Sequence, residues 1–267
     1  MGRMAEPTQN VKSAQRTLEV LELVARFPDG LTFVDLVEKL PYPKSSLHGL
    51  LQTIVAMHWL TFDPRERTYL IGVRPWEVGQ AFSRHRDLTV HARRALREAS
   101  RQLDETVQLG VLDDFDVIYI DKVEGTRMLR LVSHVGSRLP AYVTGIGKAL
   151  LSGLPAEVVS AHYAGRELTR YTPKTITSGD EVITVIDQVR ELGYATDDGE
   201  HTSGVSCVAA PVRTGDGVVA AISCPVPSAR IDSGEVEVPH LIETIKASAA
   251  AVAHALEAPG EINRDER

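Results

Sequence analysis

Residues 30–60 read GLTFVDLVEKLPYPKSSLHGLLQTIVAMHWL, and this stretch decides how the amino-terminal part of the chain folds. Its beginning predicts a short helix capped by Thr32, because a threonine hydroxyl can accept a hydrogen bond from a first-turn amide. Asp35 stands three residues further on and can reach back, as in a capping box. Pro41 and Pro43 end that helix and begin a second one, since proline is tolerated in a first helical turn. The stretch therefore predicts two short helices joined by a tight turn.

The second predicted helix has two unlike faces. Spacing by three and four residues brings its apolar side chains together on one face, namely Leu47, Leu50, Leu51 and Ile54. The opposite face holds small, hydrogen-bonding or weakly basic residues: Lys44, Ser45, Ser46, His48, Gly49 and Gln52. Small residues permit close approach to a major groove, and polar ones meet phosphates and base edges. This pattern favours a DNA-reading helix-turn-helix, although any solvated helix also turns polar residues outward.

A hairpin is predicted directly after this helix. Residues 59–62 and 68–71 are short β-like runs, and the residues between them, DPRER, are a turn signal. Such a hairpin is the wing of a winged helix, in which Arg65 and Arg67 would reach the DNA backbone. An ordinary surface hairpin would carry similar charges. The residues that we expect to contact DNA are Thr32, Lys44, Ser45, Ser46, His48, Gln52, Arg65 and Arg67.

Charge is distributed unevenly along the chain. The net charge is −7, yet residues 1–104 hold 15 Lys and Arg against 12 Asp and Glu, whereas residues 105–267 hold 14 against 24. The acidic groups therefore lie away from the predicted DNA-binding end. Because that end is only mildly basic, we expect weak non-specific binding, and tight binding only when two copies occupy one site.

Composition also bounds the kind of protein. A length of 267 residues favours about two domains, and a hydrophobic content of 43% supports buried cores. No run of about 18 apolar residues is present, and the N-terminus lacks an apolar signal core, so we expect a soluble cytoplasmic protein with no membrane partner. The two cysteines, Cys207 and Cys224, form no CxxC pair. We expect buried thiols in strands, with no disulfide, metal site or cofactor.

Three segments follow from the pattern of elements. We expect a winged helix-turn-helix over residues 11–73, linker helices over residues 74–104 and a sensing domain over residues 105–256. The first helix of the chain should bury a face marked by Ala14, Leu18, Leu21, Val24 and Ala25. The linker either pairs with its twin in a dimer or packs on its own domain. The mixed order of strands and helices predicts an α+β sensing domain with a central antiparallel sheet.

Within the predicted sensing domain, the local patterns alternate. Residues 128–135 are a strand candidate, and residues 180–192 form an amphipathic helical pattern. Residues 194–204 are polar and predict a loop. Two further strands are expected over residues 205–213 and 217–226, on either side of a glycine-containing turn.

Short motifs from about Val11 to Ala255 resemble those of the IclR family of bacterial transcriptional regulators. Each motif alone is weak, but their order and spacing together are specific. They are PKSS with His48 and Leu50-Leu51, Tyr69–Gly72, Gly136 and Pro140, TGIGKAL at 144–150, GYA at 193–195, Asp197-Asp198 with Glu200 and Gly204, and CVAAPV at 207–212. The resemblance implies a winged-helix domain, a linker helix and a GAF-like effector-binding domain. It also implies a homodimer or tetramer that binds a double-stranded DNA operator.

The resemblance further implies an effector pocket. Its members would be the apolar Met128, Leu131 and Leu139, the helix-start residues Gly145 and Ile146, and the polar or strand positions Asp197, Cys207 and Ser223. Amides at the start of a helix favour an anion, while each apolar member would serve equally well as simple core. Two positions depart from the family pattern. Gly49 stands where arginine is common, and Pro225 stands where a small polar residue is usual, which leaves room for a less polar effector.

Three functions remain in competition at this stage. The first is a regulator that controls a catabolic operon and responds to a small organic acid or aromatic carboxylate. We expect a repressor rather than an activator. The second is an enzyme acting on a small carboxylate, with Cys207 and His201, or Glu200 and His201, as its chemistry. The third is a scaffold that only dimerises. No nucleophile elbow, HExxH motif, Walker loop or Rossmann fingerprint is present, so we expect a regulator and no enzyme.

Overall fold

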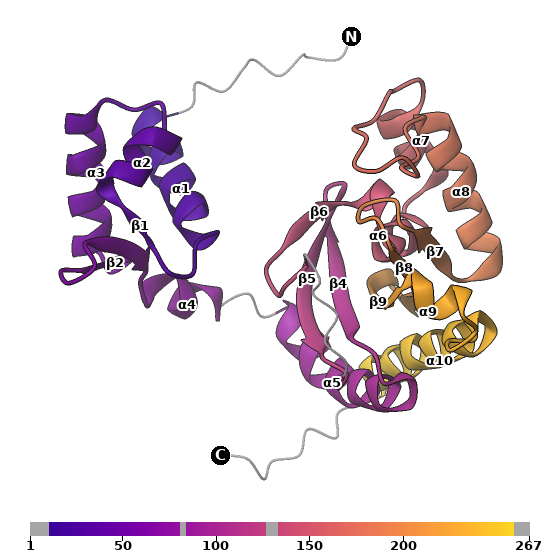
Figure 1. The fold of residues 1–267 in the computed structure, drawn as a ribbon. Coiled ribbons are helices and arrows are strands. Elements are labelled where there is room, and N and C mark those ends of the chain that lie inside the picture. Colours follow the sequence, from indigo (N-terminus) through magenta and orange to yellow (C-terminus); the bar gives the residue numbers. More distant parts are fainter. Residues whose placement is uncertain (1–10, 81–83, 127–132, 259–267) are drawn as a thin grey trace. The chain divides into compact units, whose positions relative to one another are not determined.

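The computed structural model describes residues 11–80, 84–126 and 133–258, and these residues belong to two compact units, Met1–Ser83 and Arg84–Arg267 (Figure 1). The division falls immediately before the long helix of the linker segment. Each unit has its own hydrophobic core. The two units are described separately below.

The first unit is a small bundle of helices with a hairpin. Its elements are α1 Lys12–Ala25, β1 Leu31–Thr32, α2 Phe33–Lys39, α3 Lys44–Ala56, β2 Leu60–Asp63, β3 Thr68–Ile71 and α4 Arg74–Gly79. The three strands pair antiparallel in the order β1-β3-β2. The predicted capping box is confirmed, because Thr32 Oγ1 accepts from the Asp35 amide at 3.2 Å and Asp35 Oδ2 accepts from the Thr32 amide at 2.9 Å.

The apolar face of α1 differs in part from the prediction. On α1 the buried residues are Val20 and Val24, whereas Leu18 is 60% exposed and Ala14 and Ala25 also face solvent. The expected face is therefore confirmed at Val24 and at the half-buried Leu21 and is wrong at Ala14, Leu18 and Ala25, because the periodic pattern left two neighbouring stripes with similar apolar content. On α2 the buried side chain is Leu36, and Val34 is exposed.

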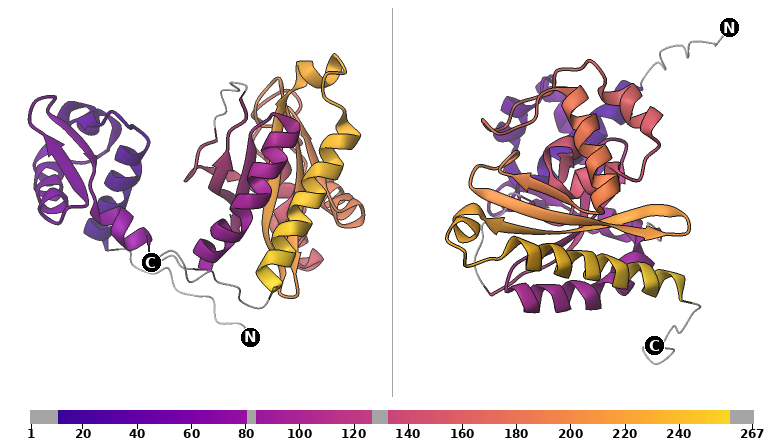
Figure 2. Two further views of the ribbon diagram at one scale, coloured as in Figure 1. Left: turned by 90° about the horizontal axis from the view of Figure 1, so that it is seen from below. Right: turned by 90° about the vertical axis from the view of Figure 1, so that its right-hand side faces the viewer.

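The second unit is a sheet covered by helices on both faces. Within its described part, six strands pair antiparallel in the order β6-β5-β4-β9-β8-β7. Helices α5 and α10 lie side by side on one face, and α6, α7 and α8 lie on the other (Figure 2). The bounds are α5 Arg84–Leu103, β4 Val107–Asp113, β5 Asp116–Val123, β6 Arg138–Pro140, α6 Gly145–Leu151, α7 Ala156–Tyr163, α8 Gly179–Leu192, β7 Ala195–Asp198, β8 Val205–Thr214, β9 Gly217–Pro227, α9 Ser228–Asp232 and α10 Val238–Glu257.

The linker helix packs on its own unit. Its residues Leu88, Ala92, Leu96 and Ala99 are buried in the core that α10 and the sheet share. Of the two alternatives for this helix, the structure therefore shows packing within the domain. The expected α+β class, with an N-terminal helix-turn-helix and an antiparallel sheet domain, is confirmed.

One local prediction in the second unit was wrong, and a second falls mostly outside the described residues. Part of the predicted loop 194–204 is the edge strand β7, whose register pairs Asp197 with Cys207. The acidic composition of β7 is typical of a loop, and only alternate residues of the strand are buried. Most of the strand candidate 128–135 lies outside the described residues, and its described residues 133–135 are not in a strand. A short strand, β6, follows at Arg138–Pro140.

Candidate functional site

The outer face of α3 is open and polar. Its inner face buries Leu47, Leu51 and Ile54, with Leu50 half-buried. The opposite residues are all exposed: Lys44, Ser45, Ser46, His48, Gly49 and Gln52. No heavy atom lies within 4 Å of where a side chain at Gly49 would begin. The helix can therefore approach a groove closely, as a recognition helix must.

The hairpin after α3 presents the two predicted arginines. Asp63 Oδ1 accepts from the Arg65 amide at 2.7 Å and from the Glu66 amide at 3.4 Å, which holds the turn in shape. Arg65 and Arg67 are exposed, and no salt bridge in the described part of the chain involves either of them. Thr32 is half-buried and its hydroxyl is engaged in the cap of α2.

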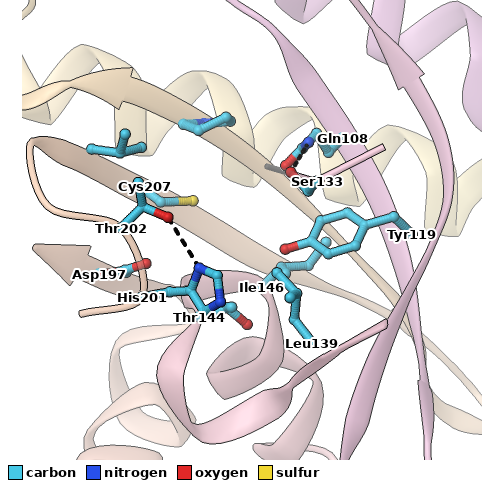
Figure 3. A pocket seen from close by; sticks show the side chains of 13 residues that line it. Gln108, Tyr119, Ser133, Leu139, Thr144, Ile146, Asp197, His201, Thr202 and Cys207 are labelled. Carbon is cyan, nitrogen blue, oxygen red and sulfur yellow. Dashed lines mark hydrogen bonds between the residues drawn. The ribbon is translucent and has the colours of Figure 1, made fainter. Parts of the chain in front are cut away.

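A cavity of about 60 Å³ lies in the second unit between α6 and one face of the sheet (Figure 3). Of the predicted effector residues, Leu139, Gly145, Ile146, Asp197 and Cys207 line it. Met128 and Leu131 lie outside the described residues. Ser223 is not part of the lining but is buried with an unpartnered Oγ. The remaining lining residues were not predicted as effector contacts: Gln108, Tyr119, Ser133, Thr144, His201, Thr202, Val205 and Pro225.

The sheet contributes polar side chains from two neighbouring rows of paired residues. Strand register pairs Gln108 with Ser223 in one row, and Cys207 with Pro225 and Asp197 in the other. Gln108, Ser223 and Asp197 are each at least nine-tenths buried. A glutamine between Val107 and Leu109 in an otherwise apolar strand was the sequence signal that could have marked the first row.

The start of α6 forms another side of the cavity. Thr144 caps the helix by accepting at Oγ1 from the Gly147 amide at 3.1 Å. The first-turn amides of Gly145 and Ile146 have no partner within the helix, as is general for helix starts. A side chain at Gly145 would begin 3.3 Å from Cys207 Sγ and 3.6 Å from Asp197 Cβ. The glycine therefore keeps the backbone close to the cavity.

A buried charge cluster lies next to Asp197. Lys148 Nζ and Glu200 Oε1 form an ion pair at 2.5 Å, and both residues are buried. The Glu200 amide donates to Asp197 Oδ1 at 2.7 Å. Burial raises the pKa of Asp197 to about 6, an effect that this hydrogen bond and the Lys148 charge partly offset.

The cysteine and histidine of the enzyme alternative do not form a nucleophilic pair. His201 Nδ1 lies 3.0 Å from Thr202 Oγ1, and no described hydrogen bond joins the imidazole to Cys207. Burial raises the pKa of the Cys207 thiol and lowers that of His201. A thiol that stays protonated is a poor nucleophile, so this arrangement favours ligand contact over covalent catalysis.

Comparison with known proteins identifies the family. The IclR helix-turn-helix domain matches residues 13–64, and the C-terminal domain of bacterial transcriptional regulator IclR matches residues 80–254. The Escherichia coli transcriptional regulator XynR is 32% identical over 250 residues, which is 93% of this chain and 98% of XynR. The Escherichia coli transcriptional repressor IclR is 32% identical over 208 residues, covering 77% of this chain and 76% of that protein. The chain belongs to the IclR family of transcriptional regulators.

Solved structures share the whole fold. A putative transcriptional regulator from Rhodococcus sp. RHA1 aligns with a TM-score of 0.75 at 26% identity, covering 92% of this chain and 98% of that one. An IclR homologue from Microbacterium hydrocarbonoxydans, solved with 4-hydroxybenzoate, aligns with a TM-score of 0.81 at 22% identity over 92% of this chain and 99% of that one. In the described ranges, no helix has the length and apolar character needed to cross a membrane.

Proposed function

We propose that this protein is a repressor that binds a DNA operator through α3 and the β2–β3 hairpin and is controlled by a small organic acid, aliphatic or aromatic, held in the cavity beside α6. The observation that carries the DNA part is the open polar face of α3, with its uncovered Gly49 and flanking exposed arginines. Several relatives are named as repressors, which favours repression over activation.

The contents of the cavity support a carboxylate effector. The unpartnered amides of Gly145 and Ile146 would hold the anion, and Leu139 supplies apolar contact. Asp197 and Cys207 would meet its remaining polar atoms, and contact with Ser223, which is buried next to the lining residues, stays a prediction from the family resemblance. Met128 and Leu131 stay predictions from the family resemblance. Control of a catabolic operon is likewise proposed from the family resemblance.

A homodimer is part of the proposal, with a tetramer as a further step. Apolar side chains are exposed on the first unit, since Trp76 is 67% exposed and Leu18 is 60% exposed. Two copies on one operator would also double the number of phosphate contacts that the mildly basic first unit makes. Light scattering at increasing concentration tests this, and Trp76→Ala should shift the protein towards monomer.

The DNA assignment is tested with a double variant. Lys44→Ala with Gln52→Ala should abolish a gel shift on the intergenic region beside the gene, because it removes one phosphate contact and one base contact. The matched control is Lys246→Ala with Gln102→Ala, which changes the same residue types at exposed positions of the second unit. Retained operator binding by the first variant, with unchanged folding, would refute the assignment of α3.

The effector assignment is tested by a thermal-shift screen with aliphatic and aromatic carboxylates. A ligand that binds only the folded state stabilises it by mass action, by about 2.7 kcal/mol at a ligand concentration of a hundred times Kd. The melting temperature rises as a result. Ile146→Trp should fill the cavity and remove the shift. A shift that persists in this variant would place the ligand elsewhere.

A further inference from the structure

Asp197 is a buried carboxylate on the wall of the cavity beside α6. It is 8% exposed and lines the cavity, with the Tyr119 hydroxyl on the opposite side (Figure 3). Its Oδ1 accepts from the Glu200 amide at 2.7 Å, while no hydrogen bond among the described residues engages its Oδ2. One oxygen is therefore fixed by the backbone, and the other is left for whatever occupies the cavity.

The charges around this carboxylate do not balance. Lys148 of α6 is the one cation among the described groups that face it, and its Nζ lies 2.5 Å from Oε1 of the buried Glu200. Asp198, the neighbour on β7, faces solvent and pairs with Lys174. The lining includes no lysine or arginine among the residues that the structure describes. Two buried carboxylates thus share a single buried ammonium.

The other titratable groups at the cavity are neutral. Burial lowers the pKa of His201, so its imidazole is uncharged at pH 7. Burial raises the pKa values of the Tyr119 phenol and the Cys207 thiol, which therefore stay protonated. None of these three side chains supplies a positive charge that could balance an acid entering the cavity.

A carboxylate effector would bring a third negative charge into this buried space. Two like charges about 6 Å apart, in surroundings with an effective dielectric constant of about 20, repel strongly enough to weaken binding roughly a hundredfold. Two carboxylates that share one site avoid this repulsion by keeping a proton on one of them. Burial already raises the pKa of Asp197 to about 6, and its Oδ2 is open, whereas Glu200 is paired with the Lys148 ammonium.

We infer that the acid binds together with one proton, which comes from the solvent and is held on Asp197 Oδ2. The neutral carboxyl then donates a hydrogen bond to the effector carboxylate instead of repelling it. The inference rests on the proposed carboxylate effector and adds that its affinity depends on pH. Because linkage is reciprocal, the bound acid strengthens proton binding by the same factor as the proton strengthens acid binding.

Titration calorimetry on the full-length protein tests this, with propionate and benzoate as an aliphatic and an aromatic probe. At pH 7.5, measurements in Tris and in HEPES, which differ in ionisation enthalpy, should reveal about one proton taken up per acid bound. The affinity should fall about tenfold for each pH unit between about 7 and 8.5. Both probes are fully ionised over this range, so the slope reports on the protein.

Asp197→Asn locates the proton. Asparagine keeps the shape of the side chain and is a permanently neutral donor, so the uptake should disappear and the affinity should become independent of pH. At pH 8.5 this variant should bind the acid at least about tenfold more tightly than the wild type, whereas loss of an ordinary contact would weaken binding. Asp198→Asn, at an exposed position of the same strand, is the matched control and should keep the wild-type uptake and slope.

His201 is the other group at the cavity that could take the proton. His201→Gln should keep both the uptake and the slope. Loss of the uptake in this variant, with the uptake retained in Asp197→Asn, would place the proton on the imidazole and overturn the assignment to Asp197.

The outcomes separate the two proposals. Proton uptake by the wild type that Asp197→Asn abolishes supports the inference. Binding without uptake at pH 7.5 overturns it and leaves the carboxylate effector standing, and this wild-type measurement does not depend on how any variant folds. Failure of both acids to bind the wild-type protein between pH 6 and 8.5 overturns the inference together with the carboxylate effector.

Discussion

The buried ion pair of Lys148 and Glu200 offers the most direct test of the structure. The ammonium nitrogen lies 2.5 Å from Glu200 Oε1, with Lys148 1% exposed and Glu200 8% exposed. Lys148→Met removes the charge and keeps most of the side-chain volume. The variant leaves the buried carboxylate of Glu200 next to that of Asp197, without the Lys148 cation that balanced their charge.

Breaking a buried pair by removing one partner costs about 3–5 kcal/mol of unfolding free energy. For a unit of this size each kcal/mol corresponds to about 2–4 °C, so the melting temperature should fall by roughly 10 °C. The double variant Lys148→Met with Glu200→Met removes both charges, and its stability should return to within about 2 kcal/mol of the wild type.

Circular dichroism during heating measures this loss in the full chain. The two tryptophans, Trp59 and Trp76, both belong to the first unit, so their fluorescence is an internal control that should be unchanged. A loss below about 1 kcal/mol in the single variant would refute the reasoning, since breaking a buried pair costs several times more. A double variant as unstable as the sum of its two single variants would show that the two side chains do not interact.

Three further outcomes follow from the described contacts. Thr32→Ala should destabilise the first unit by about 1 kcal/mol, because it removes the cap of α2, and an unchanged tryptophan-detected melt would contradict this. Burial raises the pKa of Asp197 to about 6, so the folded protein favours the protonated carboxyl. The stability that this carboxyl contributes is therefore present in acid and is lost as the pH rises from about 4 to about 6. Asp197→Asn should therefore stabilise the protein by about 1–3 kcal/mol at pH 7.5 and by almost nothing at pH 4, which urea titrations at the two pH values measure; equal effects at both would contradict the burial of this carboxyl. The double variant Arg65→Ala with Arg67→Ala should lose about two phosphate contacts, so a plot of log binding constant against log salt concentration should become less steep. An unchanged slope of this plot would show that the hairpin does not touch DNA.

The elements of the first unit were predictable because their signals are local. The capping box of Thr32 and Asp35, the prolines between α2 and α3, and the three-and-four spacing of Leu47, Leu51 and Ile54 act within one or two turns of chain. The two helices, the tight turn between them and the polar outer face of α3 therefore follow from the sequence alone. Which side of α1 is buried was not predictable. The side chains that cover Val20 and leave Leu18 exposed come from other elements.

The effector cavity depends on contacts that no local pattern contains. Gln108, Asp197 and Cys207 are separated by up to about a hundred residues in the chain, and only antiparallel pairing through β9 brings them to one face. Family resemblance pointed to Asp197 and Cys207, but Gln108 and Ser133 were found only from the structure. The sequence by itself determined the class of protein, because its ordered short motifs resemble those of one family, and it determined the helices of the first unit, because capping and hydrophobic spacing are short-range. The tertiary structure alone decided which polar side chains share a buried cavity, because strand register sets which residues become neighbours.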